Sequence, residues 1–149
     1  MTTSFDRPAQ TIRRDPLTSA RVSLREASTA AAVGDLTWSM NLFTALRKLS
    51  KVFEEHVSDS ESDSGTLPEV LLMKPHLQKR VRTLKLEHDR IRLRIREVMA
   101  VVEEQVCAPV IDIEKLRQLA GGVVSEVRKH ESKGYDLVHE AFNRVDGFD

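Results

Sequence analysis

Three histidines stand out because each one interrupts a row of apolar residues at helical spacing. His56, His88 and His130 occupy positions where the row of Leu, Ile, Val or Phe would otherwise continue. A buried neutral imidazole needs a hydrogen-bond partner or a metal ion to offset its lost hydration. For one such histidine a satisfied core residue is the simpler interpretation. Three of them, converging from separate helices, predict a metal site as readily as an ordinary core.

Carboxylates at the spacing of a bundle metal site are scarce in this chain. Helix bundles hold iron or manganese by combining imidazoles with inward carboxylates. Four residues after His56 stands Ser60, and Glu61 follows one step later, while the matching positions after His130, residues 134–135, are Gly and Tyr. We therefore expect Glu61 to be at most a weak fourth ligand beside the three histidines.

Two further acidic residues flank His88 directly. Glu87 and Asp89 are its immediate neighbours, and adjacent side chains on a helix point roughly 100° apart. A ligand set complete enough for two iron ions is therefore not predicted.

The elements that carry the histidines are three long amphipathic helices. The first is expected over about 36–58, and its apolar face is Leu42, Leu46, Leu49, Phe53 and His56. The second has the steadiest alternation of four- and three-residue steps, with Pro75 allowed in its first turn, and its face is Leu77, Val81, Leu84, His88, Ile91, Ile95, Val98 and Val102. The third follows an Asp112 cap, and its face is Ile113, Leu116, Ala120, Val123, Val127, His130 and Leu137.

Shorter or polar segments complete the organisation of the chain. Residues 17–33 predict a short helix capped by Thr18 or Ser19. The acidic, serine-rich stretch 54–64 predicts a loop or a frayed helix end, and residues 1–16 predict a flexible arm. With no strand pattern, we expect an all-α, up-and-down antiparallel four-helix bundle over residues 17–149.

Composition restricts the classes of partner. The 149 residues hold 23 basic and 23 acidic side chains, so we expect neither nucleic acid nor an anionic membrane as a partner. Cys107 is the only cysteine, which excludes an intramolecular disulfide and a multi-thiolate zinc site. An intracellular, cytoplasmic location is expected. The basic outer side of residues 79–96 is interpreted as a solvated face paired with neighbouring acids.

The order of these features resembles the hemerythrin-like family, also called the HHE cation-binding domain. The resemblance spans Leu17 to Phe142 and rests on four segments: VGDL, KVFEEHVSDSE, LKLEHDRIRLRI and VRKHESKGYDLVHEAF. The separations of 32 residues from His56 to His88 and 42 from His88 to His130 are similar to that family. The resemblance implies a four-helix bundle with a non-haem di-iron centre in which these three histidines are ligands.

The chain departs from the ligand pattern of that family at several positions. No histidine precedes His56, so the ligand expected from the first helix is missing. Arg92 stands where a second histidine of the third helix would be, Ser60 replaces the bridging Glu with Glu61 one step out of phase, and residues 134–135 replace the carboxylate of the last helix.

Two classes of function remain open on the sequence. The first is a metal-binding module that holds iron or another divalent ion through His56, His88 and His130, with Glu61 completing the set, in a sensing, storage or oxygen-related role. The second is a metal-free bundle that acts through a protein partner. Enzymatic activity is not expected, because Cys107 lacks a placeable catalytic partner and no phosphate-binding glycine loop occurs.

Overall fold

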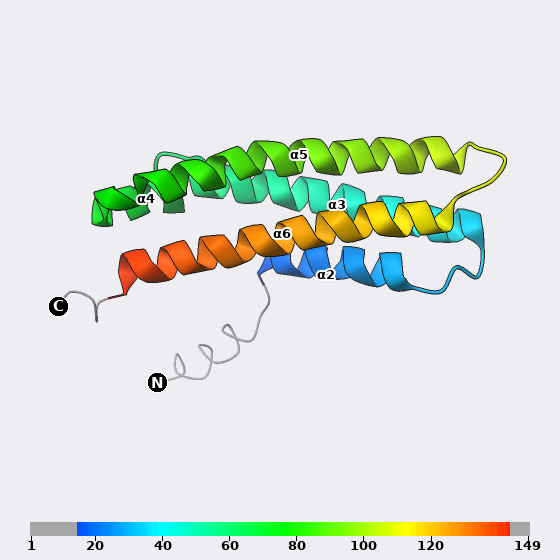
Figure 1. Ribbon diagram of the computed structural model, residues 1–149, viewed down its shortest axis with the longest axis horizontal. Coiled ribbons are helices and arrows are strands. Elements are labelled where there is room, and N and C mark those ends of the chain that lie inside the picture. Colours follow the sequence, from blue (N-terminus) through cyan, green and yellow to red (C-terminus); the bar gives the residue numbers. More distant parts are fainter. Residues whose placement is uncertain (1–14, 144–149) are drawn as a thin grey trace, which may run out of the picture.

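Four helices of the computed structural model run up and down along one bundle, as expected from the sequence (Figure 1). The structure describes residues 15–143, and within them it contains helices and no strand. The bundle consists of α2 (Pro16–Thr29), α3 (Asp35–Glu61), α5 (Gln78–Val106) and α6 (Ile113–Phe142). A short helix α4 (Thr66–Met73) and the 3₁₀ turn η1 (Pro75–Leu77) connect α3 to α5.

The apolar faces read from the sequence form the interior of the bundle. Every residue of the row expected from Leu77 to Val102 is buried, His88 included. On α6 the row is buried from Leu116 to Leu137, and only Ile113 at the helix start is partly exposed. The 3.6-residue period therefore identified the core, because long helices in a bundle must turn one stripe inward.

The wall of the bundle between α3 and α6 is built from two short helices. α2 packs against α3 and α6 over one half of the bundle, and α4 packs against the same two helices over the other half. Figure 1 shows α2 beginning near the middle of the long helices. A junction between the start of α2 and the start of α4 is thus left in this wall.

The core is divided into two apolar clusters. The larger cluster joins α2, α3, α5 and α6, and it includes Leu24, Leu46 and Val98. The smaller one lies at the α4 end, where Leu67 and Val70 meet Leu137 and residues of the first turns of α5. The three histidines belong to neither cluster, and they form a polar layer between them.

The start of α2 differs from the prediction. Asp15, rather than Thr18 or Ser19, caps α2, since its carboxylate accepts hydrogen bonds from the backbone N–H groups of Leu17 and Thr18. Pro16 fits the first helical position because its missing N–H needs no partner there. Asp15 and Pro16 are therefore part of this helix start, and residues 1–14 of the expected arm lie outside the described part of the chain. The helix also ends four residues before Val33, at Thr29.

The acidic, serine-rich segment, expected to be a loop or a frayed helix end, is mostly helical. α3 continues through it to Glu61, and Ser60 lies buried in the last turn. The chain then turns tightly at Gly65, where a Cβ would lie 2.5 Å from the carbonyl oxygen of Asp59, so only glycine fits. α4 was not predicted, because eight residues are too few to establish a helical period.

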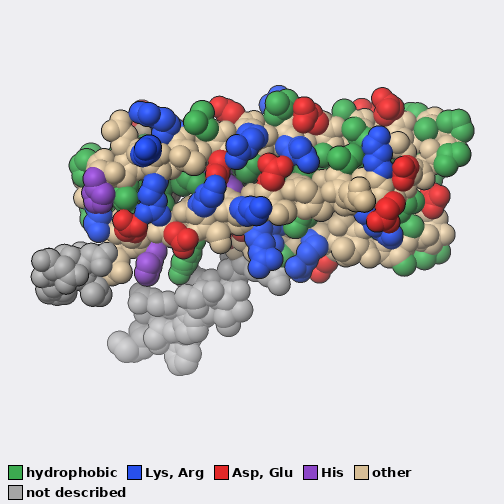
Figure 2. Space-filling view, in the orientation of Figure 1, with side chains coloured by type: hydrophobic (Ala, Val, Ile, Leu, Met, Phe, Trp, Pro, Cys, Tyr) green, Lys and Arg blue, Asp and Glu red, His purple; other side chains and the backbone are tan. Residues whose placement is uncertain are grey.

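Three basic residues of α5, Arg80, Arg92 and Arg94, pair with acids of neighbouring helices. Arg92 contacts Glu54 of α3 at 2.7 Å, and Arg80 contacts Glu140 of α6 at 2.5 Å. Figure 2 shows basic and acidic side chains interspersed over this face. Within residues 15–143, no helix has the length and apolarity needed to cross a bilayer.

Candidate metal centre

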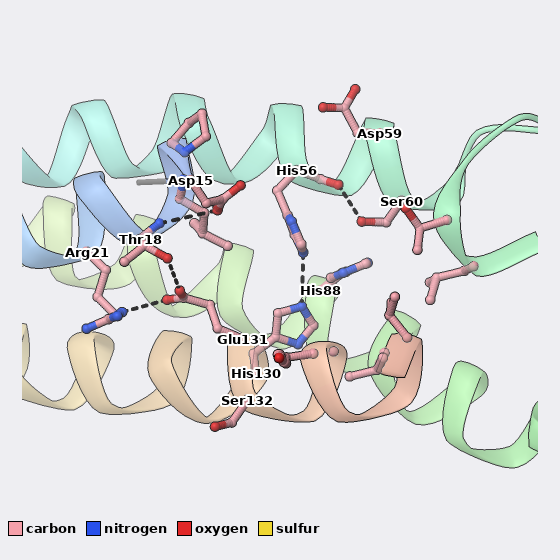
Figure 3. A pocket seen from close by; sticks show the side chains of 18 of the residues that line it. Asp15, Thr18, Arg21, His56, Asp59, Ser60, His88, His130, Glu131 and Ser132 are labelled. Atoms are coloured by element: carbon pink, nitrogen blue, oxygen red, sulfur yellow. Dashed lines mark hydrogen bonds and ion pairs between the residues drawn. The ribbon is translucent and has the colours of Figure 1, made fainter. Parts of the chain in front are cut away.

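The three histidines predicted from the apolar rows meet at one point of the bundle interior. Each comes from a different helix: His56 from α3, His88 from α5 and His130 from α6. One nitrogen of each ring can be chosen so that all three lie within 4.8 Å of one another. Nε2 of His56 lies 3.2 Å from Nε2 of His130 (Figure 3). The three side chains could therefore bind a metal ion.

Two of the rings are held by carboxylates on their far side. Nδ1 of His88 donates to Oε2 of Glu61 at 2.5 Å, and Nδ1 of His130 donates to Oε1 of Glu87 at 2.8 Å. An ionised carboxylate can only accept, so each Nδ1 carries the hydrogen and each neutral ring keeps its lone pair on Nε2. In this tautomer Nε2 is the nitrogen that is able to bind a metal ion.

Glu87 is the functional residue that the sequence reasoning missed. Its side chain is buried, and it accepts from His130 through one oxygen and from Nζ of Lys133 through the other. Glu87 points away from its neighbour His88, as expected for adjacent residues on a helix. Its carboxylate contacts His130 of the neighbouring helix α6 instead. A buried carboxylate needs such partners. In the sequence, the only sign of the role of Glu87 is its position directly beside a residue of the apolar row.

Glu61 lies beside one of the three histidines. Its carboxylate contacts the Nδ1 of His88, and its side chain is one-third exposed. It is not a member of the close group of three nitrogens. That Glu61 supplies a ligand oxygen stays a prediction.

Phe53 closes the centre from the side of the larger core cluster. It lies one turn before His56 on α3, is fully buried, and its ring centroid is 5.6 to 5.9 Å from those of the three imidazoles. The imidazoles themselves pack edge to face at 4.7 to 5.3 Å. An apolar wall of this kind excludes water from one side and fixes the ring orientations.

Burial keeps the three imidazoles neutral. It lowers the pKa of each histidine below the ordinary value of 6.5, and repulsion between the charged rings adds to this effect. The carboxylates on His88 and His130 act in the opposite direction without cancelling it. Neutral imidazole is the form that binds metal.

Glu87 is ionised while the imidazole of His130 that it contacts is neutral. Burial alone would raise the pKa of this carboxyl, but hydrogen bonds from Lys133 and His130 outweigh it, so the pKa lies below its ordinary value. The group is therefore a carboxylate near neutral pH, and it accepts from the imidazole that it orients.

The donor set fits one ion and not two. Two nitrogens bound tetrahedrally to one ion at 2.0–2.1 Å are about 3.4 Å apart, close to the 3.2 Å between His56 and His130. The resemblance would place further ligands at Ser60, at Arg92 and at residues 134–135. Ser60 donates through Oγ to the carbonyl of His56, Arg92 pairs with Glu54, and residues 134–135 are Gly and Tyr. These positions therefore supply none of the additional ligands that the resemblance implies for a second ion.

Three other side chains able to do chemistry are not part of the histidine layer. Tyr135 is largely exposed and stacks on His139. Trp38 is buried, and its Nε1 donates to the carbonyl of Ala30. Cys107 is exposed at the end of α5.

Comparison of this chain with protein-family models, with curated proteins and with solved structures finds no match.

Proposed function

We propose that this chain is a metal-binding bundle that holds one divalent transition-metal ion through Nε2 of His56, His88 and His130. The observation that carries the proposal is the pair of Nδ1–carboxylate contacts from Glu61 and Glu87. Metal-bound histidines characteristically donate their second N–H to a carboxylate, which fixes the tautomer and makes the ligand nitrogen more basic.

Three neutral imidazoles favour zinc, iron, nickel or copper over magnesium and calcium, which prefer oxygen donors. The resemblance to the hemerythrin-like family supports iron as the physiological ion in such a bundle. The donor set supports one ion in place of the family's pair, and with it a role in metal sensing or storage. When bound, the ion would supply a Lewis-acidic centre with a coordination position that the protein does not fill.

A metal titration tests the proposal. Purified, metal-free protein is dialysed against Zn²⁺ or Co²⁺, and bound metal per chain is measured by inductively coupled plasma mass spectrometry. We expect about one ion per chain. Replacement of any of the three histidines by Ala should weaken binding by 100-fold or more, whereas His139→Ala, an exposed histidine of α6, should leave it unchanged.

Two further measurements complete this test. Circular dichroism confirms that each variant is folded. Iron content after expression in iron-replete medium, with visible absorption under oxygen, then identifies whether iron is the ion taken up. Binding of the same strength in the parent and in all three histidine variants would refute the proposal.

A metal-free interaction bundle is the second candidate, and one observation favours it. The histidine layer can satisfy itself, because Nε2 of His56 can donate to Nε2 of His130 while Glu61 and Glu87 accept from the other two rings. Failure to retain any ion in the titration would select this function.

A further inference from the structure

A cavity of about 1340 Å³ opens beside the histidine layer, at the junction between α2 and α4. Its rim includes Asp15 and Pro16 at the start of α2, and Thr66 and Leu67 at the start of α4. The cavity exists because the two short helices that form this wall do not meet. His56, His88 and His130 line it as well, so the candidate metal centre is reachable from this side.

The three histidines are covered by Phe53 on one side and border the cavity on the other. Phe53 lies against all three imidazoles and is fully buried, and it is absent from the cavity lining. Within residues 15–143, an ion held by the three Nε2 atoms would therefore have Phe53 on one side and the cavity on the other. The unfilled coordination position would face the cavity.

Four polar side chains at the α2 side of the cavity, those of Asp15, Thr18, Arg21 and Glu131, are already hydrogen-bonded. Glu131 accepts from the Thr18 hydroxyl at 2.6 Å and from Nε of Arg21 at 2.5 Å, and Asp15 accepts from the first backbone N–H groups of α2 (Figure 3). A ligand gains little from groups that are already paired.

The α4 side of the cavity is apolar. Leu67 and Leu84 belong to the smaller core cluster, and Val138 and Phe142 of α6 pack against that cluster while remaining partly exposed. This side gains from contact with an apolar body. The ligand that suits both features has one metal-binding group and an aliphatic chain.

The ion determines the type of metal-binding group. Glu61 and Glu87 contact the Nδ1 atoms of two imidazoles, so an ion held by three neutral imidazoles would keep its double positive charge. An anionic oxygen donor neutralises part of that charge. A carboxylate is such a donor, and it suits the transition metals that imidazole binds.

We propose that the cavity between α2 and α4 binds an aliphatic monocarboxylate, with its carboxylate on the metal and its chain against Leu67, Leu84, Val138 and Phe142. This inference rests on the proposed metal site. It adds a ligand class, a small fatty acid or a similar apolar acid, to that site.

The test uses the full chain loaded with Co²⁺, whose visible absorption responds to a change of its ligands. Butyrate, hexanoate and octanoate are titrated in turn, and each Kd is taken from the spectral change. Each buried methylene contributes about 0.8 kcal/mol, or roughly a fourfold lower Kd. Octanoate should therefore bind up to about 200-fold more tightly than butyrate, and both should alter the Co²⁺ spectrum.

Two controls separate the contributions of the metal and the chain. Octanol has the same chain without a carboxylate, and it should leave the Co²⁺ spectrum unchanged. Val138→Trp fills the apolar side from a partly exposed position, and it should retain the metal while octanoate binding weakens at least tenfold.

Each outcome decides one of the two proposals. Co²⁺ binding with no spectral response to octanoate, or a Kd independent of chain length, would overturn the ligand proposal and leave the metal site intact. Octanoate binding of equal strength to metal-free protein would also overturn it. Loss of Co²⁺ binding itself would instead refute the metal site.

Discussion

Replacing Glu87 by Gln should weaken metal binding, although Glu87 is not one of the three proposed ligands. Gln has nearly the same shape, but it lacks the negative charge that makes the His130 ring a stronger donor. It also places an amide against the Lys133 ammonium, whose partner in the parent is a carboxylate oxygen. Removal of such a supporting carboxylate typically costs 10- to 100-fold in metal affinity. The 5% exposure of the Glu87 side chain allows little water to replace it, so we expect a loss near 100-fold, or about 2.7 kcal/mol.

Two matched variants calibrate this magnitude. Glu61→Gln changes the equivalent carboxylate on His88, but the Glu61 side chain is 33% exposed, so water can compensate and we expect about a tenfold loss. Glu140→Gln removes the same charge from the surface of α6, where it pairs with Arg80, and should change affinity less than twofold. Kd is measured for Zn²⁺ by competition with a chelator of known affinity. A folded Glu87→Gln protein with the parent's Kd would refute the role of the Nδ1–carboxylate contacts.

Three further predictions concern the metal-free protein. His88→Leu should raise the melting temperature slightly, because it removes a buried imidazole whose partner Glu61 can be hydrated. His130→Leu should lower the melting temperature, because it leaves the buried Glu87 carboxylate with Lys133 as its one remaining partner. Equal shifts in the two thermal melts would contradict this. Replacement of the fully buried Phe53 ring by Ala should cost about 3–5 kcal/mol in urea unfolding, and a loss below 1 kcal/mol would show that it does not pack the layer. Stability should fall as pH drops below 6.5, since the unfolded histidines take up protons there while the folded ones resist until lower pH; urea titrations with a midpoint independent of pH between 7 and 5 would exclude this.

The sequence predicted the long helices and the histidines because both follow from one regular period. The alternation of four and three residues continues unbroken from Leu77 to Val102, and a histidine within that row must lie where its apolar neighbours lie. The partners of the histidines were harder to predict. Glu87 lies off the stripe of its own helix, and its role depends on how α5 packs against α6, which one sequence does not specify.

Local features with weak or competing signals were also missed. The serine-rich end of α3 resembles a loop in composition, but Val57 and Ser60 are buried in the bundle, and this packing keeps the segment helical. Asp15 was assigned to the arm, although an Asp directly before a Pro is a strong start signal. α4 is short, and its position beyond the start of α2 in the same wall creates the cavity, which no periodicity could reveal.

The number and the ligands of the bound ion decide the central claim most directly. Extended X-ray absorption fine structure of the Zn²⁺-loaded chain measures both the donor atoms and any neighbouring metal. We predict three imidazole nitrogens at about 2.0–2.1 Å, one ion per chain and no metal–metal scattering. A spectrum with fewer than two imidazoles, or with a second metal within about 4 Å, would contradict a single ion held by His56, His88 and His130.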